Sequence, residues 1–440
     1  MKHCWLAVVG TLLVGVGTMR AQAPAAPGAL DSPAWADAGL SLEPCPTPQR
    51  SWASAEYLMW WIGNHADAVP LVTTTSDNPL ILGSSGTSTS PTTTVLLGGA
   101  LDSPLRSGGR FTAGFWLDDT ANVAVEGSYF FLAPRTLTQS VGTPGTPGSP
   151  NLFVPFFDVS GFRTLTGLPG EATGPIAGPG FPFAGPLNVQ NGVFTERYQS
   201  SLQGAELNGL YRLATGGSST LDLVAGLRWV QVHEDLNFSG NINGVPGSNR
   251  DGLIYNFQDD FNARNNFYGA QLGLRTQVRL GRGFDLSATG KVALGAMHQA
   301  AAINGFTSTN FITGLQQGGA FNGAALQALP GGVFAQPGNI GDHSQCRFAV
   351  VPEVTVNLSY QLASWVRIHA GYNFLLLTNV ARPDDLIDRN INASATGMTN
   401  ALRAAGFFSV APVGPTAPTF NGRDSVYWAQ GLNFGLGFSW

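Results

Sequence analysis

The sequence contains little charge. Of its 440 residues, 22 are Lys or Arg and 27 are Asp or Glu, so 11% are charged, against about 25% in an average soluble protein. This is too little charge to cover an ordinary soluble surface. The formal net charge is −5 and no run of Lys and Arg occurs, which excludes the basic surface that a nucleic-acid partner requires.

Features of helical proteins and of one enzyme class are also missing. The 57 Gly and 28 Pro residues exceed what helix interiors tolerate, so a helical bundle is excluded. Beyond the N-terminal segment no window approaches 18 consecutive apolar residues, so no membrane-spanning helix is expected. The sequence has no Gly-x-Ser-x-Gly motif, the nucleophile turn of lipase-like enzymes.

The N-terminus has the pattern of a secretion signal. Lys2 precedes an apolar stretch over residues 5–16, and small residues that include Ala21-Gln22-Ala23 follow. This pattern predicts a secretory signal peptide over residues 1–25. The alternative, a membrane anchor, needs about 20 apolar residues, and Arg20 ends the stretch too early.

The next segment is rich in Pro and Ala and has no periodicity. It predicts a flexible periplasmic lead over residues 26–52. The remaining residues, 53–440, form the predicted outer-membrane barrel domain.

Apolar residues alternate with polar or small ones through most of this domain. In the last segment Leu432, Phe434 and Leu436 share one face of an expected strand, because alternate residues of a strand point the same way. The chain ends on an aromatic, Trp440. The ten predicted strands span approximately residues 54–62, 109–117, 121–132, 198–213, 220–236, 265–280, 283–298, 347–362, 364–378 and 426–440.

The connections between these segments alternate between short and long. The short ones are residues 118–120, 214–219, 281–282 and 363, and the long ones are residues 63–108, 133–197, 237–264, 299–346 and 379–425. An even number of strands with this rhythm is typical of bacterial outer-membrane barrels. Aromatic residues near segment ends, such as Trp229, Trp365 and Trp428, fit the girdles found at membrane interfaces.

These patterns predict an all-β fold, an antiparallel transmembrane β-barrel of about ten strands with short periplasmic turns and five long external loops. A soluble β-sandwich or propeller is the alternative. Its water-facing side would carry Lys and Glu, whereas here one face of nearly every strand is apolar throughout.

The polar face of the strands would enclose the lumen. We expect cross-strand ion pairs there, because an unpaired charge in so confined a space costs several kcal/mol. Ten strands enclose a narrow lumen, which this charge ladder would largely block. The predicted lumen charges are Glu56, Glu126, Glu206, Arg212, Asp222, Arg228, Arg275, Arg279, Asp285, Lys291, Glu353, Arg367 and His369.

Several segments resemble one family. They include Ala55-Glu56-Tyr57-Leu58-Met59-Trp60-Trp61, Glu126-Gly127-Ser128-Tyr129-Phe130-Phe131-Leu132, Gly226-Leu227-Arg228-Trp229 and Arg382-Pro383-Asp384-Asp385-Leu386-Ile387-Asp388. In this order they are similar to the BBP family, the outer-membrane β-barrel proteins expanded in planctomycete-type bacteria, a domain family of unknown function. The resemblance covers most of residues 54–440. It implies a barrel fold and an outer-membrane location, and it supplies no catalytic residues.

Two acidic groups lie on predicted external loops. Asp384, Asp385 and Asp388 form one, and Asp259 with Asp260 begins the other. Such oxygen ligands suit Ca²⁺, but neither has EF-hand spacing, and Asp side chains that fix turns are the favoured interpretation. No metal site and no cofactor are therefore predicted.

Two histidines are candidates for hydrolase chemistry. His233 precedes Glu234 and Asp235, and His343 follows Asp342. Hydrolytic barrels of the omptin kind use Asp and His to activate water. Adjacent strand residues face opposite ways, however, so sequence adjacency alone does not make a catalytic pair.

The two cysteines beyond the signal peptide are Cys45 and Cys346. The topology places them at opposite ends of a membrane core about 25 Å tall. We therefore expect no disulfide between them.

The connection 133–197 is rich in Pro and Gly, which disfavours regular structure. A solvated low-complexity loop is the favoured interpretation. Its phenylalanines, among them Phe153, Phe156 and Phe157, also fit a plug or a contact surface.

Together these features predict a non-enzymatic outer-membrane protein of a Gram-negative cell envelope that acts as an anchor or displays its loops. A small-solute porin is the first alternative and an omptin-like surface hydrolase the second. The expected partners are outer-membrane lipid, the barrel-assembly machinery through the strand that ends at Trp440, and surface partners of the long loops.

Overall fold

The computed structural model describes residues 50–63, 69–75, 93–99, 105–164, 167–179, 189–407 and 409–440. The predicted signal peptide and nearly all of the predicted lead lie outside these residues. In the described part of the chain no helix is long and apolar enough to cross a membrane.

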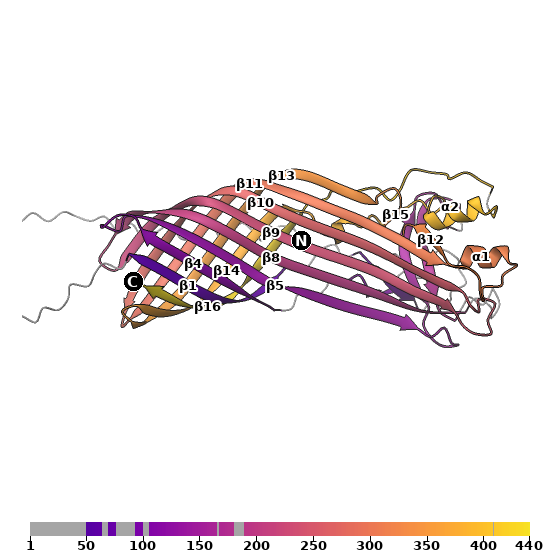
Figure 1. Cartoon of the computed structure of the whole chain (residues 1–440), viewed down its shortest axis with the longest axis horizontal. Helices are drawn as coiled ribbons and strands as arrows, with labels where there is room; N and C mark the ends of the chain where they lie inside the picture. Colours follow the sequence, from indigo (N-terminus) through magenta and orange to yellow (C-terminus); the bar gives the residue numbers. More distant parts are fainter. Residues whose placement is uncertain are drawn as a thin grey trace, which may run out of the picture. The chain divides into compact units, whose positions relative to one another are not determined.

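Ten antiparallel strands close into a ring. Their order is β10-β9-β8-β5-β4-β1-β16-β14-β13-β11, and pairing between β10 and β11 completes the circle. The strands are β1 (Ser51–Ile62), β4 (Arg106–Trp116), β5 (Val123–Thr143), β8 (Gln190–Thr215), β9 (Ser219–Gly244), β10 (Ile254–Gly281), β11 (Phe284–Thr309), β13 (Gly341–Ala363), β14 (Val366–Val380) and β16 (Ser425–Ser439). All ten predicted strands are present (Figure 1).

The short connections lie together at one end of the ring, which we call the turn end; the other end is the loop end. Between β10 and β11 the φ angles of Gly281 and Gly283 are +85° and +82°, values that favour glycine. Between β4 and β5, the carboxylate of Asp118 accepts hydrogen bonds from the amides of Asn122 and Val123 at 2.9 and 2.8 Å. Local sequence thus explains the tight turns.

The connection expected at residues 237–264 is mostly strand, which corrects the prediction. β9 continues to Gly244 and β10 begins at Ile254, so only a short turn remains at the loop end. β5, β8, β11 and β13 are also longer there than predicted, and in Figure 1 these strands continue toward the end that carries α1 and α2.

The outward faces of these long strands change character partway along. Toward the turn end they are apolar: Leu227 of β9 is 65% exposed and Leu272 of β10 is 60% exposed. The paired aromatics Trp229 and Tyr268 end this part.

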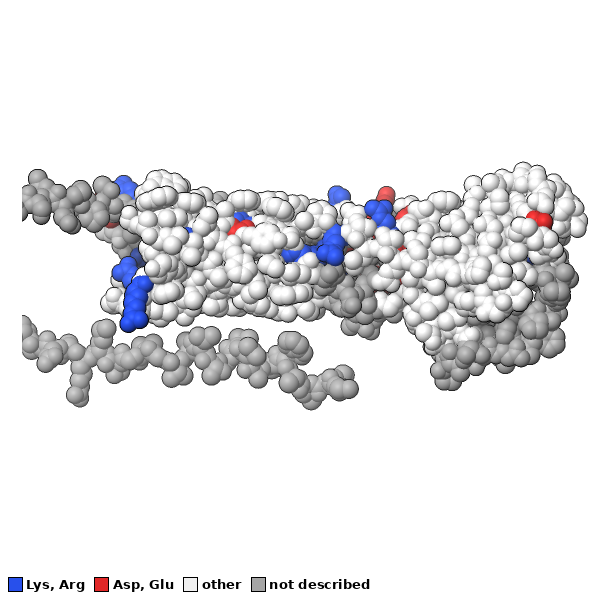
Figure 2. Space-filling view, turned by 90° about the horizontal axis from the view of Figure 1, so that it is seen from below, with Lys and Arg blue, Asp and Glu red and all other residues white. Residues whose placement is uncertain are grey.

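Polar side chains follow directly on the loop-end side of this aromatic pair. Tyr129 Oη donates to Gln203 Oε1, Gln203 Nε2 donates to Gln231 Oε1, and Gln231 Nε2 donates to Asn266 Oδ1, each at 2.8 Å. From here to the loop end the outward residues of β9 are Gln, His, Asp, Asn and Ser. On the face in Figure 2, charged side chains gather near the turn end and about midway along the ring.

The inward faces change in the opposite sense. On β9 the inward residues Asp222 and Arg228 lie toward the turn end, whereas Leu236, Phe238 and Ile242 lie toward the loop end. The ring is therefore apolar outside and polar inside at one end, and polar outside and apolar inside at the other. The outside of the second part suits water, because its apolar side chains are buried within.

A second sheet fills the loop end of the ring. It consists of β2 (Val72–Thr75), β3 (Thr93–Leu97), β6 (Leu152–Asp158), β7 (Gly170–Ala177) and β15 (Asn390–Ile391). Buried Leu152, Val154 and Phe156 share one apolar core with Phe238 and Phe257 of the ring.

Shorter elements complete the loop end. They are α1 (Phe311–Gln316), β12 (Gln327–Pro330), the 3-10 helix η2 (Asp384–Leu386) and α2 (Gly397–Ala404). We call the second sheet, these elements and the polar-faced strand ends around them the head.

The favoured prediction of a solvated loop over residues 133–197 is wrong for the part that forms β6 and β7. Phe153 and Phe156 are buried in this core, at 0% and 6% exposure. Pro155 does not interrupt the sheet, because it lies at an irregularity in the pairing of β6 with β7. The register of this pairing shifts between Phe153 and Pro155, and proline is tolerated at such bulges.

Candidate functional site

The lumen has a cavity of about 550 Å³ on the turn-end side. All the predicted lumen charges except Arg228 line it. Arg279 and Asp285, which are register partners across β10 and β11, belong to the lining near the turns. The cavity therefore brings together twelve of the thirteen charges that the period-two pattern assigned to the lumen.

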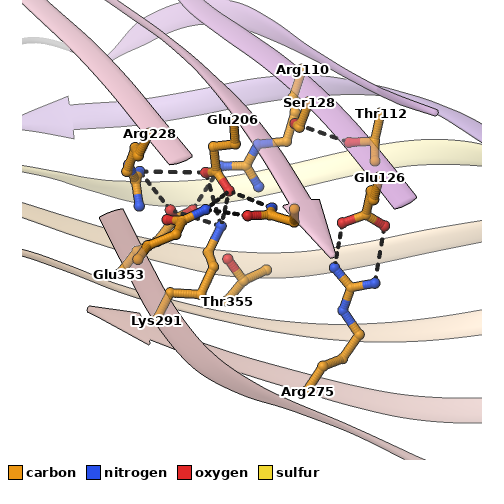
Figure 3. Close-up of polar contacts among 12 residues, drawn as sticks. Arg110, Thr112, Glu126, Ser128, Glu206, Arg228, Arg275, Lys291, Glu353 and Thr355 are labelled. Carbon is orange, nitrogen blue, oxygen red and sulfur yellow. Dashed lines mark hydrogen bonds and ion pairs between the residues drawn. The ribbon is translucent and has the colours of Figure 1, made fainter. Parts of the chain in front are cut away.

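Six charged side chains close the inner end of this cavity, and Figure 3 labels all of them except Glu56. We call them the charge cluster: Glu56, Arg110, Glu206, Arg228, Lys291 and Glu353. Each comes from a different strand of the ring. Three are cations and three are anions, so the cluster is balanced.

Glu353 is the centre of the charge cluster. Its carboxylate lies 2.6 Å from Arg228 Nη2, 3.3 Å from Lys291 Nζ and 3.3 Å from Arg110 Nη2. The Glu206 carboxylate lies 2.7 Å from Lys291 Nζ and 3.6 Å from Arg228 Nη2. The Arg228 side chain is 0% exposed and that of Glu353 is 3% exposed, so each depends on its partners for compensation.

Two further ion pairs lie closer to the turn end. Arg275 donates two hydrogen bonds to Glu126, at 2.6 and 3.0 Å, and Arg212 Nε donates to Asp222 Oδ1 at 2.8 Å. The expected cross-strand pairing is thus present. Arg110 was not singled out from the sequence, although its alternation with the outward residues Phe111 and Phe115 would have placed it inside.

An apolar layer lies on the loop-end side of the charge cluster. We call it the apolar plug; it is built from inward residues of every ring strand except β4. Trp60 and Phe130 have ring centroids 5.8 Å apart, and the Arg110 guanidinium lies 5.5 Å from the Trp60 centroid. The residues of the apolar plug are Leu58, Trp60, Ile62, Phe130, Leu132, Leu202, Val230, Val232, Phe267, Ala293, Met297, Ala349, Val351, Leu375, Leu377, Val380, Tyr427 and Ala429.

The sequence-based expectation that charges alone block the lumen is therefore incomplete. Trp60, Phe267 and Met297 are each 0% exposed. Their positions continue the period-two pattern, but they lie where the apolar face has moved to the inside.

One more ion pair lies beyond the apolar plug. Arg382, from the connection after β14, donates to both carboxylate oxygens of Glu234 at 2.8 and 2.9 Å. Tyr198 donates to the same carboxylate, and the guanidinium lies 5.2 Å from the Tyr427 ring centroid. This pair fastens the connection to the inner wall of the ring.

The two acidic groups singled out in the sequence have structural partners. Asp385 accepts a hydrogen bond from Ser425, and Asp388 accepts from the amides of Asn390 and Thr419 at 3.0 and 3.2 Å. The described residues contain no group of three or more His, Cys, Asp and Glu placed to hold a metal ion, and this includes Asp384, Asp385 and Asp388.

Asp259 belongs to β10, not to a loop. It points inward, whereas Asp260 points outward. Its carboxylate accepts the amides of Val333, Phe334 and Ala335 at about 3.0 Å. Burial raises the pKa of Asp259 to about 7, against the lowering effect of these three bonds.

The two histidines singled out in the sequence lie apart, on β9 and on β13. His233 and Asp235 share the outward face of β9, with 3.3 Å between Nε2 and Oδ2, while Glu234 faces inward to Arg382. His343 Nε2 donates a hydrogen bond to Asn339 O at 3.0 Å, and the imidazole stacks on Phe420 with the ring centroids 3.9 Å apart. Cys346 is an exposed free thiol on β13, and Cys45 lies outside the described residues.

A known protein family matches most of the chain. The family described as "Putative beta barrel porin-7 (BBP7)" matches residues 52–440. The chain belongs to this family. This confirms the resemblance found in the sequence and the location in the cell outer membrane.

Solved structures resemble the BBP7 chain only distantly, and no curated protein matches it. The outer-membrane protease OmpT from Escherichia coli is 10% identical over 90% of this chain and 98% of that chain, with a TM-score of 0.39. The toluene transporter TodX from P. putida is 8% identical over 89% and 90%, with a TM-score of 0.23.

Removing one member of the charge cluster should destabilise the BBP7 protein strongly. Glu353→Gln leaves Arg228 buried with Glu206 at 3.6 Å as its remaining carboxylate. We expect a loss of about 3–5 kcal/mol in the free energy of unfolding, measured by urea titration in lipid vesicles.

The control is Asp119→Asn, which removes one partner of the exposed pair with Arg50. It should change stability by roughly 0–1 kcal/mol. Equal effects of the two variants would contradict the assigned role of Glu353.

The pKa of Asp259 predicts a pH dependence in the head. Because the folded-state pKa is raised from 3.8 to about 7, the folded form binds more protons than the unfolded form between these values. The stability of the head should therefore fall as pH rises through this window and level off above about 7. Hydrogen exchange of the amides of residues 333–335, corrected for the intrinsic rate, measures it.

Asp259→Asn should flatten this dependence. Asp260→Asn, on the outward face, should leave most of it. A profile that is identical in wild type and Asp259→Asn would contradict the prediction.

Proposed function

We propose that this protein is a non-enzymatic outer-membrane anchor whose ten-stranded transmembrane barrel is sealed and holds a folded head at the cell surface. In this proposal the short connections of the turn end lie in the periplasm and the connections of the loop end lie outside, as in other bacterial barrels. The apolar outer belt faces lipid, and the polar outer faces above Trp229 and Tyr268 face water.

The observation that carries the proposal is the filling of the lumen. The charge cluster, the apolar plug and the Arg382–Glu234 pair follow one another along the ring, and Arg228, Trp60 and Glu234 are at most 3% exposed. A solute would have to break compensated buried charges and displace a packed apolar layer. Such a lumen supports anchoring better than conduction.

A small-solute porin is the second candidate. Two observations favour it. The family is described as a porin family, and a polar cavity of about 550 Å³ occupies the turn-end part of the lumen. Conduction would require the apolar plug to rearrange. An omptin-like hydrolase is disfavoured, because His233 and Asp235 lie on the outer wall of β9, where their side chains are 27% and 38% exposed.

Planar-bilayer recording tests the choice between anchor and porin. The wild type should produce no steady single-channel steps, because the charge cluster and the apolar plug block the lumen. The double variant Trp60→Gly with Phe130→Ala removes the neighbouring aromatic pair of the apolar plug and should produce steps or more frequent openings.

The matched control is Tyr57→Gly with Phe131→Ala, which removes outward side chains of the same two strands. It should stay silent. Regular steps from the wild type would overturn the sealed-anchor proposal in favour of a porin.

The membrane boundary makes a separate prediction. Leu272→Lys places a charge on the outward face among exposed apolar residues, and we expect a loss of about 2–4 kcal/mol in the free energy of unfolding. Ser239→Lys, on the polar outward face of β9, should be nearly neutral. Urea titration in lipid vesicles compares them, and equal losses would mean that the two faces meet the same solvent.

A further inference from the structure

The head contains a second pocket, far along the ring from the turn-end cavity. Its volume is about 350 Å³, and residues of β6, β7, α2 and the loop-end parts of β8, β9 and β10 line it. The volume falls in the range of small-molecule sites, roughly 300–1,000 Å³. None of the lining residues belongs to the charge cluster or to the apolar plug.

The lining combines an apolar wall with positive charge. Phe156, Phe311, Ile391 and Leu402 supply apolar surface. Arg163 and Arg250 supply the charge, and no Asp or Glu occurs among the described lining residues. A wall of this kind favours a ligand with an apolar body and a negatively charged group.

Arg250 is held in place by two aromatic rings. Its guanidinium carbon lies 5.2 Å from the centroid of Phe311 and 5.6 Å from that of Phe321. These two rings are stacked, with 8° between their planes. Burial lowers the pKa of Arg250, so an anion bound beside it would offset part of the cost of keeping the guanidinium charged.

The opposite wall is also fixed before any ligand arrives. Asp259 binds the amides of residues 333–335, and Val333 lines the pocket. Gln336 donates to Gly332 O at 2.7 Å and accepts from the amide of Gly397 at 3.2 Å, which joins this turn to α2. A preformed wall reduces the entropy lost on binding.

We propose that this pocket binds small organic anions with an aromatic or other compact apolar body. The carboxylate or sulfonate pairs with Arg250 and Arg163, and the body packs on Phe156, Phe311 and Leu402. The inference goes beyond the anchoring role and depends only on the geometry of the head. With the topology proposed above, the pocket is accessible to solutes outside the cell.

Isothermal titration calorimetry of the full chain in detergent tests this proposal, with empty micelles as the blank. The probe is 2-naphthoate, and 2-naphthylmethanol and 2-naphthylmethylammonium have similar bodies without the negative charge. We expect saturable binding of 2-naphthoate with one site per chain. The neutral and cationic probes should bind at least about tenfold more weakly.

Substitutions at two arginines, Arg250 and Arg163, locate the site. Arg250→Gln should weaken 2-naphthoate binding about tenfold or more, and Arg250→Lys should restore part of it. Arg163 is exposed, so Arg163→Gln removes the second charge without affecting the core and should also weaken binding. Arg264→Gln, on the outer wall of β10, is the matched control and should bind as the wild type does.

The proposal is overturned if 2-naphthoate shows no saturable heat, if all three probes bind equally, or if both glutamine variants bind like the wild type. These outcomes are independent of the bilayer recordings, because binding to solubilised protein does not require a sealed lumen. A conducting wild type that binds 2-naphthoate would reject the anchor and keep the pocket.

Discussion

The solvent on each side of one continuous sheet determines this structure. A strand presents alternate residues to its two faces, and the long strands of the ring meet a different pair of environments at each end. Below Trp229 and Tyr268 the outer face is apolar and the inner face is charged. On the loop-end side of this pair the faces exchange roles, so the same backbone pairing forms a wall that is apolar outside and then a wall that is polar outside.

This exchange explains what fills the interior. The most deeply buried charges can face inward at the turn end because they have partners of opposite sign within reach, as Glu353 has in Arg110, Arg228 and Lys291. At the loop end the inward face is apolar and needs apolar cover, which the second sheet supplies through residues such as Leu152 and Phe156. The apolar plug lies between these two regimes and closes the lumen.

The head and the lumen are therefore built differently. The lumen is packed and charge-compensated, which suits a rigid support. The head contains the second pocket and the connections that fold as β6, β7 and α2. Asp259 connects the ring to this pocket. Its buried carboxylate, on a ring strand, fixes a turn that also forms part of the pocket wall.

The ten strands, the short turns and the turn-end charges were predictable, because period-two patterning and turn residues are local in sequence. The strand ends were not. A segment such as 237–244 of β9 keeps the period but moves its apolar residues to the other face, so it looks like a loop when a lipid-facing stripe is expected.

The sequence by itself therefore determined that this chain forms strands, how many there are in the ring and which side chains near the turns point inward. Only the tertiary structure decided which charges meet, that Trp60 and Phe130 help close the lumen, and that a proline-rich connection folds against the ring. These contacts join residues far apart in the chain, and whether a face must be apolar depends on what lies across from it, which no local pattern contains.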